Sequence, residues 1–193
     1  MKILVIQNRM GIGDMIMFLP FVKAISNYYG EQISLMVKKN TKASEYLNEE
    51  KYIKEIIYLE RSEVESRHAG IKGFFNLIND FKFKKFDKVF IFNSSLRFLL
   101  ICKMAGIKDI SQYPLFRKKD NIVTSAKIFT ENELGEIVST QPELIVNDNK
   151  VNEAKQKFSN DFKHICLGIS ASGPTKRWDI KNFIKLCIDI NAR

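Results

Sequence analysis

Apolar and polar positions along the chain form blocks that predict strands alternating with helices. Four consecutive aliphatic residues at 3–6, bounded by polar residues, predict a short strand buried on both faces. Apolar residues at helical spacing between Phe18 and Tyr29 predict a helix that turns back over this strand. The same patterns predict further strands at 32–37, 53–59, 88–92 and 108–111, and further helices at 41–47, 71–81, 96–104 and 122–134. This alternation is typical of a doubly wound parallel sheet, so residues 1–140 are predicted to form one α/β domain.

The pattern lapses at 141–150, where a polar, extended stretch with Pro142 predicts an interdomain linker. After it the sequence predicts a helix at 151–162, a strand at 164–169, a loop rich in hydroxyl groups at 170–176, and a last helix capped by Asp179. Residues 151–193 therefore look like the beginning of a second domain. About 45 residues are too few for an independent α/β domain. We expect either that this domain is cut short or that its elements pack on the first.

A glycine loop that ends in a carboxylate joins the first strand to the first helix. Gly11 and Gly13 permit a tight turn and a close approach of a ligand to the backbone. Asp14 is expected at or near the N-cap of the helix. Because the loop after the first strand commonly lines the ligand crevice of an open α/β sheet, Asp14 is a candidate base. The alternative is that Asp14 only caps the helix.

A dinucleotide-binding loop is another interpretation of this stretch, and two features argue against it. The G-x-G-x-x-G pattern requires a third glycine at position 16, which is occupied by Ile16. The acidic residue that would bind the ribose is also missing, because Lys38 and Lys39 follow the second strand. A site for NAD is therefore not expected.

The excess of basic over acidic residues indicates which classes of partner the chain could bind. The chain has 31 Lys and Arg residues against 22 Asp and Glu, a formal net charge of +9. This excess favours anionic partners such as nucleotides, phosphorylated substrates, acidic membrane surfaces or nucleic acid. A solvated basic surface is the alternative, because the charge is spread thinly. Nucleic acid is not expected, since the aromatic residues follow core periodicity and do not alternate with the basic clusters.

The cysteines and histidines do not have the spacing of a metal site. Cys102, Cys166 and Cys187 lie far apart within apolar segments, which indicates buried thiols in a reducing compartment. His68 and His164 are expected to be structural or exposed. The N-terminal apolar run is too short for a signal peptide, and no run approaches the ~20 residues that span a bilayer. A soluble, cytoplasmic protein is therefore expected.

Two motifs together carry a resemblance to a known family. The first is Lys2-Ile-Leu-Val-Ile through Gly13-Asp14, with Pro20 after it. The second is Gly168-Ile-Ser-Ala-Ser-Gly-Pro-Thr-Lys-Arg-Trp178, followed by Phe183 and Leu186. With these motifs in this order the chain resembles glycosyltransferase family 9, the lipopolysaccharide heptosyltransferases. The resemblance implies a GT-B fold, in which 1–140 is a Rossmann-like acceptor-side domain and 151–193 is the first helix, strand and helix of a truncated nucleotide-sugar-binding domain.

The resemblance implies roles for residues of the first loop. Asp14 matches the aspartate proposed as general base, which takes the proton from the acceptor sugar hydroxyl as this attacks the anomeric carbon of ADP-heptose. Arg9, Gly11 and Gly13 belong to the acceptor-side loop. Many family members carry a basic residue directly after the first strand, where this chain has Gln7, and Arg9 is the residue expected to substitute for it.

The second motif implies a donor site. Ser172 and Lys176 match the hydroxyl and the lysine that hold the phosphates of the donor, and Ser170 is placed with them. A lysine near a helix N-terminus would neutralise the diphosphate leaving group. No metal and no cofactor are implied, since the ADP-sugar is a substrate. Trp178 is expected to pack the loop against its helix instead of touching substrate.

The resemblance thus implies an enzyme that transfers a heptose-like sugar from an ADP-sugar to a lipopolysaccharide core acceptor, a phosphorylated glycolipid at the inner membrane surface. The later donor-site motif of the family, an aspartate and glycines before a histidine, would lie beyond Arg193. We therefore expect the chain to be inactive alone. The alternative is a non-catalytic acceptor-binding half, or a decayed relative, that needs a separately encoded C-terminal half. The expected location is the cytoplasm, with peripheral attachment to the inner membrane as a second expectation.

Overall fold

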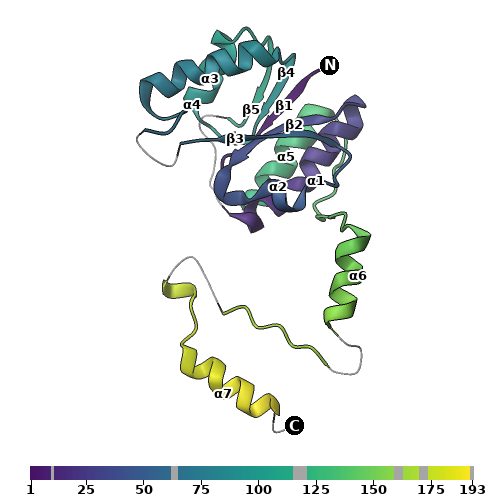
Figure 1. Ribbon diagram of the computed structural model, residues 1–193. Coiled ribbons are helices and arrows are strands. Elements are labelled where there is room, and N and C mark those ends of the chain that lie inside the picture. The colour runs from purple at the N-terminus through teal and green to yellow at the C-terminus, as the bar shows by residue number, and fades with distance from the viewer. Residues whose placement is uncertain (10, 62–64, 115–120, 159–162, 170–173, 192–193) are drawn as a thin grey trace. The chain divides into compact units, whose positions relative to one another are not determined.

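The computed structural model describes the chain except for residues 10, 62–64, 115–120, 159–162, 170–173 and 192–193. The chain divides into two compact units, Met1–Asn147 and Asp148–Arg193, drawn in Figure 1. Each unit is described by itself.

Unit 1 is built on a five-stranded sheet in which every pair of neighbouring strands is parallel. The strand order is β3-β2-β1-β4-β5. The strands are β1 Ile3–Ile6, β2 Ile33–Lys38, β3 Ile53–Leu59, β4 Lys88–Ile91 and β5 Asp109–Gln112. The doubly wound parallel sheet expected for residues 1–140 is confirmed, and each predicted strand end lies within one residue of the observed one.

Helices cover both faces of this sheet (Figure 1). On one face α1 (Ile12–Tyr29), α2 (Ala43–Tyr46) and α5 (Ile122–Leu134) enclose one buried cluster, and on the other α3 (Gly70–Lys84) and α4 (Leu96–Met104) enclose a second. Ile3 and Val5 join the first cluster while Leu4 and Ile6 join the second, because successive side chains of a strand point to opposite faces. The central strand is therefore buried on both sides, as its aliphatic run predicts.

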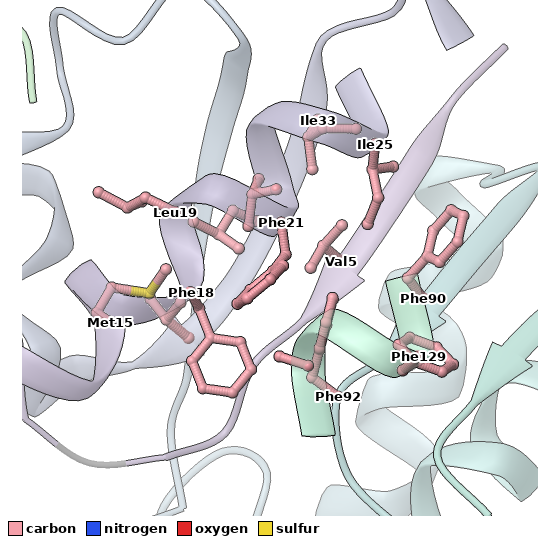
Figure 2. Packing of buried hydrophobic residues seen from close by; sticks show 14 of the residues in the cluster. Val5, Met15, Phe18, Leu19, Phe21, Ile25, Ile33, Phe90, Phe92 and Phe129 are labelled. Atoms are coloured by element: carbon pink, nitrogen blue, oxygen red, sulfur yellow. The ribbon is translucent and has the colours of Figure 1, made fainter. Parts of the chain in front are cut away.

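Aromatic rings dominate the first cluster. Figure 2 shows Phe18 of α1 directed toward Phe92, which follows β4, and Phe129 of α5 near the same ring. The ring centroids of Phe18 and Phe92 lie 5.3 Å apart and those of Phe92 and Phe129 5.2 Å apart, both edge to face. The aromatic residues that were predicted to follow core periodicity thus fasten α1 and α5 to the sheet.

Two local predictions are wrong. Segment 41–47 is not one helix opened by a Thr cap, because a 3₁₀ turn at Lys39–Thr41 precedes α2. The buried hydroxyl of Thr41 donates to the carbonyl of Lys38 at 2.7 Å instead of capping a helix. Segment 164–169 does not form the predicted strand, and almost all of it is exposed. A strand is stable only where a neighbour accepts its hydrogen bonds, and no described residue of unit 2 lies in a strand.

Unit 2 contains α6 (Asp148–Lys157), a 3₁₀ turn at Pro174–Lys176 and α7 (Ile180–Asn191), and neither α-helix has a buried residue. The carboxylate of Asp179 accepts the N–H of Lys181 at 2.9 Å, so the predicted cap of the last helix is confirmed. The ring of Trp178 packs edge to face on Phe183 of α7, with 4.9 Å between centroids. None of the helices in the described ranges is long and apolar enough to cross a membrane.

The cysteines differ in burial, against the expectation that all three are buried. Cys102 is a buried residue of α4, and burial raises the pKa of its thiol to about 12. Cys166 and Cys187 are exposed, because the apolar segments that carry them belong to unit 2, which has no buried helix residue.

The stretch 141–147 is tied to unit 1. The N–H of Ile145 donates to the carboxylate of Glu50 at 2.7 Å, and Lys23 pairs with Glu143 at 2.7 Å. The division between the two units falls after Asn147, and α6 begins directly after it.

Candidate functional site

The winding of the sheet reverses beside β1. The chain runs from β1 outward through β2 to β3 and then returns to the other side of β1 with β4 and β5. The loop after β1 enters α1 on one face, and the loop after β4 enters α4 on the opposite face. Ligands of open α/β sheets bind at the carboxyl ends of the strands where such a reversal leaves a crevice. The candidate site therefore lies at the ends of β1 and β4.

Asp14 lies in the first turn of the helix that leaves β1. The helix begins at Ile12, with Gly11 as N-cap at φ 98°, so Asp14 is the third helical residue. The positive φ requires glycine at position 11, and this places the helix start ahead of Asp14. A Cβ atom at Gly13, the residue before Asp14, would meet no heavy atom within 4 Å outside its chain neighbours.

The carboxylate of Asp14 does not cap the helix, since the start of α1 has no side-chain cap hydrogen bond. Within the described part of unit 1 the carboxylate makes no hydrogen bond and no ion pair, and the side chain is only partly buried. The interpretation of Asp14 as a structural cap therefore lacks its hydrogen bond. The exposed N–H groups of a first helical turn attract negative charge, so a carboxylate is compatible with this position.

Amide side chains hold the two loops at the reversal point. Gln7, which follows β1, is fully buried, and its side-chain oxygen accepts the N–H of Arg9 at 3.1 Å. Asn93, which follows β4, accepts the N–H of Ser95 at 2.9 Å. The amide of Gln112 then donates to the carbonyls of Asn93 at 3.1 Å and Ser95 at 3.0 Å. The buried amide nitrogens of Gln7 and Asn93 have no hydrogen-bond partner among the described residues.

These amides were not all found from the sequence. Gln7 was noted only because it replaces a basic residue, and Asn93 and Gln112 were missed. The signal that could have found them is a polar side chain directly after a buried strand of a parallel sheet. Arg9 is partly buried in the same loop and makes no ion pair with a described residue.

A basic cavity of about 770 Å³ opens at the carboxyl ends of β2 and β3. It is lined by Lys38, Lys39, Asn40, Lys42, Ser44, Glu45, Tyr58, Leu59, Glu60, Arg61 and Ser66. The Tyr58 hydroxyl donates to the Ser44 hydroxyl at 2.7 Å and accepts the Ser44 N–H at 3.1 Å, which joins α2 to β3 at the wall of the cavity. The four basic side chains outnumber the two acidic ones, so the cavity suits an anion.

In the sequence, Lys38 and Lys39 indicate only that no ribose-binding carboxylate follows the second strand. Their relation to Arg61 was missed, because it depends on β2 and β3 being neighbours in the sheet. Arg61 also lies within electrostatic reach of Arg97 on α4. Burial of the Arg97 guanidinium and, after it, the charge of Arg61 lower the pKa of Arg97. Positive charge is thus concentrated along this edge of the sheet.

The predicted donor site belongs to unit 2. Lys176 ends the 3₁₀ turn ahead of α7, and its side chain is exposed. Ser170 and Ser172 lie outside the described residues. Asp14 and Lys176 fall in different units, so each half of the predicted site stands by itself. Among the described residues no group of three or more His, Cys, Asp or Glu could hold a metal ion.

Comparison with known proteins finds similarity in structure. No protein-family model matches the sequence, and no curated protein matches it. The chain is similar to the structure of a glycosyltransferase of family 9 from Veillonella parvula, with a TM-score of 0.72 and 18% identity over 96% of this chain. It is also similar to ADP-heptose LPS heptosyltransferase II of E. coli, with a TM-score of 0.63 and 21% identity over 98% of this chain.

The two comparisons establish the fold. The resemblance based on the two sequence motifs is confirmed as a likeness in fold to these glycosyltransferase structures, over nearly the whole chain. The chain spans 58% of the length of the first structure and 62% of the second.

Proposed function

We propose that this chain is the acceptor-side part of a glycosyltransferase that uses a nucleotide sugar, with Asp14 as its general base. One observation carries the proposal: an unpaired carboxylate stands in the first helical turn after β1, beside the reversal point of a sheet whose fold occurs in glycosyltransferases. For the substrates we propose an ADP-heptose-like donor and a lipopolysaccharide core acceptor, by analogy with the E. coli heptosyltransferase.

The reaction requires one proton acceptor near the nucleophile. The Asp14 carboxylate takes the proton of an acceptor hydroxyl while the hydroxyl oxygen forms a bond to the anomeric carbon of the donor. The bond from that carbon to the diphosphate breaks, and the diphosphate leaves with the electron pair. Asp14 is free for this role because no cation or hydrogen-bond donor among the described residues holds its carboxylate.

The basic cavity supports a phosphorylated acceptor. Lys38, Lys39 and Arg61 line it at the same edge of the sheet as Asp14. Charge-assisted hydrogen bonds from lysine and arginine to phosphate oxygens are among the stronger polar contacts of proteins. An acceptor bound by its phosphate in this cavity would reach toward the end of β1, because β1 and β2 are adjacent.

The donor side of the proposal rests on Lys176, together with Ser170 and Ser172. The ammonium group of Lys176 would stabilise negative charge on the departing diphosphate, and the first N–H groups of α7 would add to this. In this proposal the charge of the diphosphate is met by side chains and backbone, without a metal or another cofactor.

A second candidate is a non-catalytic acceptor-binding half that needs a separate donor-binding partner. It would account for unit 2, whose helices have no buried residue and whose segment 163–169 has no strand neighbour among the described residues. A partner that supplies parallel strands would bury these elements.

The test is a transfer assay with ADP-heptose and a heptose-free lipopolysaccharide acceptor, for the chain alone and with an added donor-binding domain. Asp14→Asn should lower the transfer rate by ~10²-fold or more and leave thermal stability nearly unchanged. Glu136→Gln, an exposed carboxylate in the loop after α5, is the control and should retain full activity. Near wild-type turnover by Asp14→Asn would contradict the assignment of the base. Acceptor binding without any transfer in either preparation would favour the second candidate.

A further inference from the structure

Helices α3 and α4 cover the same face of the sheet (Figure 1). Both helices also carry large apolar side chains that are exposed. On α3 the side chain of Ile71 is 80% exposed and that of Phe75 is 52% exposed. On α4 the residues Leu96, Leu100 and Met104 are each about half exposed. Within each helix these residues are four positions apart, so they form one stripe along its outer side.

The first turns of the two helices are in contact. The guanidinium of Arg97 on α4 lies 5.3 Å from the ring centroid of Phe74 on α3. The same group donates to the carbonyl of Gly70 at 3.0 Å, directly before Ile71. The beginning of α4 is thereby held beside the beginning of α3. We call the five residues Ile71, Phe75, Leu96, Leu100 and Met104 the α3/α4 patch.

The charge around the α3/α4 patch is almost entirely positive. The two helices carry the basic residues Lys72, Lys82, Lys84, Arg97 and Lys103. Their one acidic residue is Asp80, which is already engaged by Arg67 and His68. The ammonium groups of Lys72, Lys82 and Lys103 make no ion pair with any described residue.

We propose that the α3/α4 patch docks the protein on the surface of an anionic lipid bilayer. Contiguous exposed apolar patches on soluble proteins mark interaction sites, and apolar side chains ringed by lysines fit the boundary between acyl chains and phosphate headgroups. The lysine stems lie along the apolar surface while their ammonium groups reach the headgroups. A second copy of this chain is a poorer occupant, because a two-fold contact of the patch with itself would oppose lysines to lysines.

The location of the patch links it to the candidate site, although the inference does not depend on the transfer reaction. Both helices start at the carboxyl ends of the strands, since each follows a strand of a parallel sheet. Ile71 lies in the first turn of α3 and Leu96 in the first turn of α4. Both are near the edge of the sheet, at the carboxyl ends of its strands, that holds Asp14 and the basic cavity. Docking would bring that edge to the membrane surface.

Cosedimentation with lipid vesicles tests the inference. We expect the chain to bind phosphatidylcholine vesicles that contain phosphatidylglycerol, to bind pure phosphatidylcholine much less, and to be released by salt. The double variant Phe75→Ser with Leu100→Ser should weaken binding by about tenfold or more, because two apolar side chains no longer insert. Lys72→Glu with Lys103→Glu should weaken it as well.

The matched control is Tyr28→Ser with Ile128→Ser. These two side chains are 50% and 49% exposed on α1 and α5, on the opposite face of the sheet, and their loss should leave vesicle binding unchanged. Circular dichroism melting confirms that each variant is folded. Absence of binding by the wild-type chain, or an equal loss in the control, would overturn the inference. So would a dimer that dissociates in the patch variant while vesicles bind neither protein.

Discussion

His68 and Glu60 are joined by two hydrogen bonds across the base of the loop that follows β3. The His68 N–H donates to the Glu60 carbonyl at 2.9 Å, and the Glu60 N–H donates to His68 Nδ1 at 3.0 Å. Because Nδ1 accepts, the proton of the neutral imidazole lies on Nε2, which is 3.2 Å from the carboxylate of Asp80 on α3. The imidazole thus connects the loop that carries Arg61 to α3. His68 is 4% exposed, so of the two expected possibilities, structural or exposed, it is structural.

Gly73 allows this arrangement, and its replacement should destabilise the protein. A Cβ atom at position 73 would lie 2.0 Å from the carbonyl carbon of His68, so the backbone would have to shift. We expect Gly73→Ala to lower the free energy of unfolding by about 1–3 kcal/mol, measured by urea denaturation. Gly13→Ala is the control, because a Cβ there meets nothing and alanine favours the helix. Equal stability of Gly73→Ala and the wild-type chain would contradict the close contact.

Asp80 should make stability depend on pH in the acid range. Partial burial opposes its ionisation, but hydrogen bonds from Arg67 and His68 outweigh this and hold the pKa of Asp80 below its ordinary value. A carboxyl whose pKa is lower in the folded state stabilises the fold above its unfolded pKa of about 3.9, and this stabilisation is lost as the pH falls through the folded pKa.

The measurement compares unfolding free energies of the wild-type chain and Asp80→Asn across pH. Because Asp80 is partly exposed, the difference should reach no more than about 1 kcal/mol near neutral pH. It should shrink as the pH falls below about 4. Asp189→Asn removes an exposed carboxylate of α7 and should show no such trend. A difference that stays constant down to the acid range would show that the Asp80 carboxylate is not specifically stabilised.

The basic cavity should bind the phosphate of an acceptor. Replacing Lys39 or Arg61 by alanine removes one positive charge from its wall, and we expect each change to weaken the binding of a phosphorylated acceptor by about tenfold. The dephosphorylated acceptor should bind weakly, and neither substitution should change its affinity. Lys127→Ala, on α5, is the control for net charge. Isothermal titration calorimetry measures the affinities, and an equal effect of Lys127→Ala would assign the effect to overall charge instead of the cavity.

Lys176 should act more on the transition state than on donor binding. Negative charge on the diphosphate grows as the bond to the sugar breaks, so in a preparation that transfers sugar Lys176→Ala should lower kcat more than it raises the donor KM. The exposed Lys176 is a single cation, and for the chain alone we expect ADP binding in the millimolar range or none. Micromolar ADP binding by the chain alone, or a variant changed only in KM, would show that this loop is misassigned.

The sequence by itself determined the type of the sheet and the secondary structure of unit 1 except at segment 41–47. Buried strands and amphipathic helices follow from side-chain periodicity, which is a local property, so helices such as Leu96–Met104 were predicted to the residue. Local chemistry also determined the cap at Asp179 and the end of α5 at Gly135, whose φ of 71° favours glycine. The two motifs that resemble glycosyltransferase family 9 pointed to the fold that the solved structures share.

Tertiary structure decided the features that depend on residues far apart in sequence. Lys38 and Arg61 line one cavity because β2 and β3 are neighbours, and no local pattern contains that pairing. The strand predicted at 164–169 did not form, since a strand needs a partner and periodicity does not provide one. Cys102 is buried and Cys166 is exposed, although both lie in apolar segments. The side chain of Asp14 does not cap α1, because the conformation of Gly11 places the start of the helix ahead of it. That conformation depends on how the chain leaves the sheet.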